Sequence, residues 1–200
     1  MAITTYTELE TAVKNWLHRA DLDNRIPEFI ALAEARFYIG SNPVRTISMQ
    51  ARTTGTTASG ALSLPSDYLE TIRLVCTSSG KYNSLEYMTA DLFSKYEDIN
   101  GIPRWFTLLN GEIKTAPNSD ADYVLDYYKR LPSLESTTTN AILTAYPNLY
   151  LYGALLEASP YVGDNAETML WAQAYDDAVK GINKSENKKF ESASMSVKAN

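Results

Sequence analysis

Apolar residues near the start of the chain recur every three or four positions, which is the spacing of one face of an α-helix. The first such stripe consists of Leu9, Val13, Trp16, Leu17 and Ala20. At its start, Thr7 and Glu10 have the spacing of a capping box. The second stripe consists of Ile26, Phe29, Ile30, Ala33 and Phe37, with Pro27 suited to a first helical turn. Only the short segment 21–24 separates the two stripes, so we expect an antiparallel helix pair.

The hydrophobic period then changes to that of a strand. Arg52–Gly60 is small and polar and is predicted to be a loop. Beyond it, Leu74 and Cys76 lie in an alternating run, and Tyr123–Arg130 has the same alternation. Asn110-Gly111, between two strand-like runs, is a strong hairpin signal. Residues from about 61 to 130 are therefore predicted to form a compact β-rich unit.

A helical pattern returns after the Ser/Thr-rich link Ser133–Asn140. Pro147 fits the first turn of a helix that Pro160 and Gly163 are expected to end. Asp164 or Asn165 can cap the next helix, whose apolar pattern continues to Ile182 and then fades.

These patterns predict an α+β fold: a small antiparallel helical bundle of two N-terminal and two C-terminal helices, with a central β-rich insertion. The predicted divisions are an N-terminal helical half (1–60), the insertion (61–132), a C-terminal helical half (133–182) and an extended tail (183–200).

Charge and composition narrow the classes of function. The 200 residues include 18 Lys and Arg against 24 Asp and Glu, so the net charge is −6, and a chain this acidic is a poor candidate for wrapping nucleic acid. The first residues do not resemble a signal peptide, and the longest apolar run, Leu149–Leu156, is too short to span a membrane. The single cysteine allows no intrachain disulfide and suits a reducing compartment.

Motifs for chemistry are missing from the sequence. It has no phosphate-binding loop, no dinucleotide-binding glycine motif and no nucleophile elbow. We interpret His18 as a solvated helix residue and Cys76 as a buried, inert thiol. Asp120 and Asp122 are interpreted as turn residues rather than cation ligands. We therefore predict no catalytic residue, no metal site and no cofactor.

The chain has 14 tyrosines against 5 phenylalanines, and tyrosine is favoured where surfaces are half buried. Core packing explains many of these residues, but contact between copies of the chain is a second interpretation. The candidates for subunit contact are Tyr127, Tyr128, Tyr150 and Tyr152.

Several segments together resemble the head–tail adaptor proteins of tailed bacteriophages, in particular the short-tailed type called tail tubular protein A-like or head completion proteins. The segments that carry the resemblance are Thr5–Phe37, Leu64–Glu70, Leu85–Phe93, Gly101–Leu108, Asp126–Leu134 and Tyr146–Asp164. Each is weak alone, and their order and spacing over about Thr5–Ile182 make the resemblance specific.

The resemblance implies a non-enzymatic structural protein of the virion, made in the host cytoplasm. Such adaptors form a ring, usually of twelve copies, that docks under the portal protein at the head–tail junction. The ring continues the DNA channel, without specific DNA binding, and gives the tail nozzle or tail tube a platform. The resemblance also implies a C-terminal segment that clasps the portal. The candidates for portal contact are Asn187, Lys188, Lys189, Phe190, Met195 and Val197.

Two alternatives stay open at this level. One is a virion-associated hydrolase with two carboxylates in a cleft of the β-rich unit, and the other is a helical protein-binding module.

Overall fold

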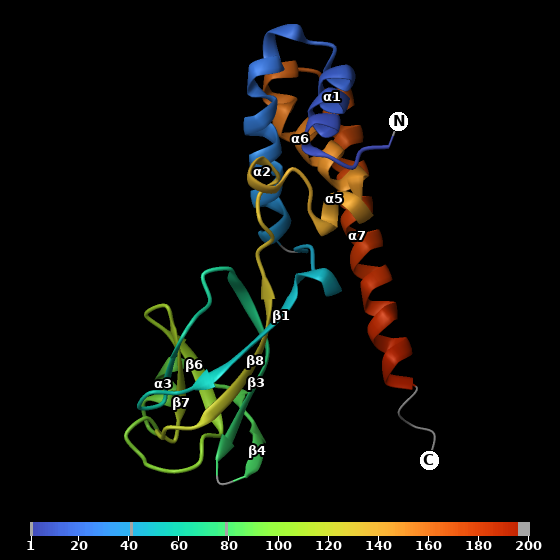
Figure 1. The fold of residues 1–200 in the computed structure, drawn as a ribbon. Helices are drawn as coiled ribbons and strands as arrows, with labels where there is room; N and C mark the ends of the chain where they lie inside the picture. Colours follow the sequence, from blue (N-terminus) through green and yellow to red (C-terminus); the bar gives the residue numbers. More distant parts are fainter. Residues whose placement is uncertain (1, 41, 79, 196–200) are drawn as a thin grey trace. The chain divides into compact units, whose positions relative to one another are not determined.

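The structure is a computed structural model that describes residues 2–40, 42–78 and 80–195. The chain divides into two compact units. The helical unit contains the residues up to Ser48 and those from Leu131 onward, and the β unit contains Met49–Arg130. The protein is therefore an α+β protein in which the β unit is inserted between the two halves of the helical unit (Figure 1).

Helix α6 is the central element of the helical unit, because it packs against α1, α2, α5 and α7. The α-helices of this unit are α1 (Tyr6–Leu17), α2 (Ile26–Tyr38), α4 (Leu134–Thr137), α5 (Ala141–Ala145), α6 (Pro147–Val162) and α7 (Asn165–Met195). Two short 3-10 helices accompany them, η1 (Ala20–Arg25) and, at the boundary with the β unit, η2 (Ile47–Met49).

The apolar stripe predicted for the second helix is buried, and the stripe predicted for the first is buried in part, because Trp16 and Ala20 are exposed. Leu9, Val13 and Leu17 of α1 face the core, and all five predicted positions of α2 do the same. The predicted capping box is wrong by two residues: Thr5 is the N-cap, and the Glu8 side chain accepts from the Thr5 N–H group. Thr7 and Glu10 lie inside the helix, because the Leu9 N–H group already donates to the Thr5 carbonyl group over 3.0 Å. The Tyr6 N–H group donates to the Thr138 carbonyl group over 2.7 Å.

Close packing of α2 and α6 depends on small residues. A methyl group added at Gly153 would lie 3.0 Å from Cβ of Ala33. One turn away, the rings of Phe37 and Tyr150 meet edge to face with centroids 4.8 Å apart. The prediction that Pro160 ends this helix is wrong, because Pro160 lies inside the last turn and Gly163, at a φ of 73°, forms the C-cap.

Helix α7 continues through Met195 (red in Figure 1). The prediction of an extended tail from residue 183 is therefore wrong for 183–195. The helix continues past residue 182 because Ile182 and then Glu186 extend its buried stripe. Asp164 caps the start of this helix, since its side chain accepts from the Ala166 N–H group over 2.8 Å.

The β unit contains two four-stranded sheets, with strand orders β1-β8-β3-β4 and β2-β7-β6-β5. All neighbours are antiparallel except β5 and β6, which are parallel. The elements are β1 (Gln50–Thr56), β2 (Ala61–Ser63), β3 (Tyr68–Ser78), β4 (Lys81–Ser84), β5 (Glu86–Tyr87), α3 (Ala90–Phe93), β6 (Trp105–Leu109), β7 (Glu112–Ala116) and β8 (Asp122–Lys129). The hairpin predicted at Asn110-Gly111 joins β6 and β7, with both residues at positive φ.

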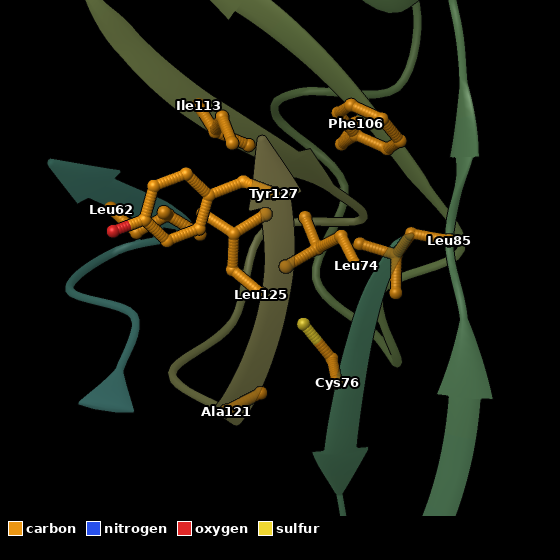
Figure 2. Close-up of a cluster of buried hydrophobic side chains, with 9 residues drawn as sticks. All are labelled: Leu62, Leu74, Cys76, Leu85, Phe106, Ile113, Ala121, Leu125 and Tyr127. Atoms are coloured by element: carbon orange, nitrogen blue, oxygen red, sulfur yellow. The ribbon is translucent and has the colours of Figure 1, made fainter. Parts of the chain in front are cut away.

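Side chains from both sheets meet in one core (Figure 2). Leu74 and Cys76 of β3 point into it, opposite Leu125 and Tyr123 of β8, while Arg73 and Val75 lie on the other face. Ile113 and Phe106 contribute from the second sheet. The alternation in the sequence therefore separates a core face from an outer face, as a half-buried strand requires.

Strand β1 occupies most of the segment predicted to be a loop, so the prediction is wrong for residues 52–56. Its partner is β8, where Arg52 lies opposite Asp126 and Gly55 opposite Tyr123. A Cβ atom at Gly55 would lie 2.9 Å from the Tyr123 hydroxyl oxygen, so the glycine leaves room for that ring. Threonine has a high strand propensity. The polar run forms a strand because it pairs with β8, which is distant in sequence.

Candidate functional site

The buried stripe of α7 carries one charged residue. Trp171, Tyr175, Val179 and Ile182 follow one another at helical spacing and are at most 7% exposed. Glu186 comes one turn later on the same face and is 3% exposed. A carboxylate at such a position requires hydrogen-bond partners, because burying an unpaired charge is costly.

Three donors surround the Glu186 carboxylate. The Ile47 N–H group donates to Oε2 over 2.8 Å, and the Tyr146 hydroxyl group donates to Oε1 over 2.8 Å. Lys189, three residues along the helix, donates to Oε1 over 2.5 Å. Burial alone would raise the pKa of Glu186, but the three donors outweigh it and hold the pKa below its ordinary value.

Asn183 makes a second connection one turn earlier. Its Oδ1 accepts from the Arg45 N–H group over 3.1 Å, and its Nδ2 donates to the Pro43 carbonyl group over 3.0 Å. Asn183 and Glu186 thus fasten the segment 42–47 to α7. We call these two residues the α7 anchor. It sets the point from which the helix continues toward its C-terminal end.

The candidates for portal contact begin at this anchor. Asn187 and Lys188 are exposed, and Lys189 is exposed although its ammonium group pairs with Glu186. Phe190 and Met195 lie within α7, but the structure does not describe their side chains. Val197 lies outside the described residues.

The four tyrosine candidates are not brought together. Tyr150 is 1% exposed in the helical core, where its hydroxyl group lies between Asn140 and Glu34. Tyr127 is 6% exposed in the β core and donates to Asp67 over 3.0 Å. Burial leaves these two side chains no surface for a second copy, so as contact residues they are corrected to core residues.

Tyr128 and Tyr152 are half-buried. Tyr128 is a residue of β8, and Tyr152 meets the ring of Trp16 edge to face, with centroids 6.0 Å apart. Trp16, which sequence analysis assigned to the apolar stripe of its helix, is 48% exposed. The pair Trp16–Tyr152 therefore presents an aromatic edge where α1 meets α6.

The residues considered for chemistry take structural positions. His18 is exposed and forms the left-handed C-cap of α1 at a φ of 50°. Burial raises the pKa of the Cys76 thiol to about 11, which keeps it protonated. Asp120 accepts from the Ser59 N–H group and Asp122 from the Thr56 hydroxyl group, each holding a neighbouring segment. Among the described residues, no group of three or more His, Cys, Asp or Glu side chains could hold a metal ion.

A small pocket in the β unit bears on the hydrolase alternative. It measures about 190 Å³, and its lining includes Glu97, Asp98 and Lys114. Ligand pockets are usually larger, and Asp98 is exposed to solvent.

One comparison with known proteins decides the family. The model of the SU10 adaptor protein family matches residues 4–197, nearly the whole chain. The chain belongs to the SU10 adaptor protein family. No curated protein matches it.

Membership of the SU10 adaptor family confirms the resemblance to phage head–tail adaptors. The adaptor is a structural protein of the virion and binds portal and tail proteins. The closer likeness to tail tubular protein A stays a prediction. No helix in the described part of this adaptor is both long enough and apolar enough to cross a membrane.

Proposed function

We propose that this adaptor forms a ring of twelve copies between portal and tail at the head–tail junction, continues the DNA channel and gives the tail nozzle or tail tube its platform. The observation that carries the proposal is the family match over residues 4–197. The net charge of −6 supports the role as a conduit, because like charge weakens contacts with DNA phosphates.

The C-terminal part of α7 is the portal contact in this proposal. The α7 anchor holds the helix as far as Glu186, so the residues that follow leave from a fixed point of the helical unit. Asn187, Lys188 and Lys189 supply polar and cationic groups, and Phe190, Met195 and Val197 supply apolar ones. Lysines suit acidic rims, and apolar side chains suit the centre of an interface.

Subunit contact in the ring uses the two of the four candidate tyrosines that keep an accessible surface. They are Tyr128 of the β unit and Tyr152, which lies beside Trp16. Aromatic side chains of this kind are enriched at the centres of protein interfaces.

Electron microscopy of the chain mixed with the portal protein of the same phage tests the ring. We expect added ring-shaped density on the portal face that points toward the tail. A portal that carries no added density under conditions where both proteins are folded would contradict the proposal.

A truncation tests the portal contact. Ending the chain after Lys189 removes residues 190–200 and keeps the three donors described above for Glu186. We expect a folded protein with unchanged thermal melting that no longer binds the portal. The matched point variants are Lys188→Glu, which is expected to weaken portal binding, and Lys81→Glu in the β unit, which is expected to leave it unchanged. Normal binding by the truncated chain would assign the contact elsewhere.

A further inference from the structure

Three lysines line the exposed face of α7. Lys180, Lys184 and Lys188 are spaced four residues apart, so they lie along one side of the helix, about 6 Å from one to the next. Together with Asn42, Asn183 and Asn187 they line a shallow groove of about 430 Å³. We call these three residues the lysine row.

The three lysines of the row stand outside the ion pairs found among the described residues. None of its members forms an ion pair with another described residue, in contrast to Lys14, Arg36 and Lys189. Asp176 lies one turn before Lys180, but the structure contains no ion pair between them. Three adjacent cations on one face of a chain with a net charge of −6 fit an acidic partner.

The same helical unit carries a matching cluster of carboxylates elsewhere. Glu10, Glu34 and Glu135 come from α1, α2 and α4, and we call them the acidic cluster. Two hydrogen bonds bring these elements together: Leu134 N–H to Glu34, 2.9 Å, and Tyr6 N–H to Thr138, 2.7 Å.

Electrostatic effects agree with this geometry. Burial raises the pKa of Tyr6 to about 12, and the charges of the three glutamates add to the shift. Burial also raises the pKa of Glu34, with a further contribution from the charge of Glu135. None of the three carboxylates has an ion-pair partner among the described residues.

We propose that Lys180 and Lys184 of one copy contact the acidic cluster of the next copy, while Lys188, at the end of the lysine row, belongs to the portal contact. This inference rests on the proposed ring. A closed ring needs head-to-tail contacts between two different surfaces of each copy, and these two surfaces are different and of opposite charge. The lysines of each copy then face the carboxylates of one neighbour, and its carboxylates face the lysines of the other neighbour.

Charge reversal on each surface tests the contact. The variants are Lys180→Glu with Lys184→Glu, and Glu10→Lys with Glu135→Lys; Lys188 and the more buried Glu34 stay unchanged. Lys81→Glu with Lys95→Glu is the matched control, because both lysines are exposed in the β unit. Thermal melting establishes that each variant is folded. Two readouts are used at low and high salt: light scattering of the chain alone, and the mass of its complexes with portal.

We expect each reversed variant, tested alone, to self-associate at least about tenfold more weakly than the native chain. We expect its binding to portal, measured as the mass of the complexes, to fall by a similar factor. An equimolar mixture of the two variants restores both readouts, because each then meets the opposite charge on the other. The control behaves as the native chain, and high salt weakens native association.

The possible failures are distinct. If native rings form on the portal and either reversed variant forms them equally well, the lysine row is not a subunit contact and the ring stands. If the lysine variant loses portal binding and the mixture does not restore it, the occupant of the row is the portal. If the row instead retains DNA in a filter-binding assay, the occupant is DNA. If the native chain forms no ring with portal and does not associate alone, both proposals fail.

Discussion

The hydroxyl group of Tyr146, in the turn between α5 and α6, donates a 2.8 Å hydrogen bond to Oε1 of Glu186 on α7. The contact joins the turn to the point where α7 begins its C-terminal part. In Tyr146→Phe, Glu186 keeps the donors Ile47 N–H and Lys189 and loses one of three. We expect the free energy of unfolding to fall by about 1–2 kcal/mol, measured by urea denaturation. An unchanged unfolding midpoint would show that water replaces the hydroxyl group without loss.

The lowered pKa of Glu186 gives a prediction for acid stability. The unfolded chain takes up the proton at higher pH than the folded one, so the contribution of Glu186 is complete above its ordinary pKa and is lost as the pH falls through the folded value. Glu186→Gln should therefore be less stable at neutral pH and lose less further stability on acidification to about pH 4. Urea titrations over a pH series measure this, with the exposed Glu28→Gln as control. Parallel curves for native and Glu186→Gln proteins would contradict it.

Two glycines in helices make a matched pair for packing. At Gly153 a new methyl group would lie 3.0 Å from Cβ of Ala33, whereas at Gly181 nothing lies within 4 Å. Gly153→Ala should lower the free energy of unfolding by about 1–3 kcal/mol because the α2–α6 contact must open. Gly181→Ala should raise it by about 0.5–1 kcal/mol because alanine favours helix. Thermal or urea unfolding measures both changes in the free energy of unfolding. Equal effects at the two sites would refute the packing argument.

The thiol of Cys76 should be inert in the native state. It is 0% exposed, and burial raises its pKa to about 11, so below that pH the reactive thiolate is scarce. A disulfide reagent at pH 8 is expected to react with the unfolded protein in denaturant and not with the native one. Rapid labelling of the native protein would mean that the β core opens readily.

The helical part of the fold could be predicted where apolar residues recur with one period and their partners are near in sequence. The stripe of α2 is an example. In the β unit the same holds for the turn at Asn110-Gly111, whose signal is local in sequence. The predicted capping box is two residues too late because Thr5 and Thr7 both have a glutamate three residues later, and the sequence alone does not distinguish the two pairs. Strand β1 was missed because its polar threonines carry no alternation and its partner lies more than sixty residues away.

The candidate site was less predictable than the fold. Residues after 182 have few apolar side chains, so their pattern indicates an unpacked segment. The stripe of α7 in fact continues, but in Glu186, a residue whose burial depends on Ile47 and Tyr146. The spacing from Val179 and Ile182 to position 186 is the one sequence signal that pointed there. The tyrosines gave no such signal, since a buried and an exposed tyrosine look alike in sequence.

The β unit closes on its own ends. Its first strand residue, Gln50, lies in register with Tyr128 of β8, near the point where the chain leaves the unit. Adjacent ends mean that a segment of any length could be exchanged there at little cost in closing the loop. The helical unit should therefore accept a shorter or longer insertion between these two ends with little change in its own folding free energy.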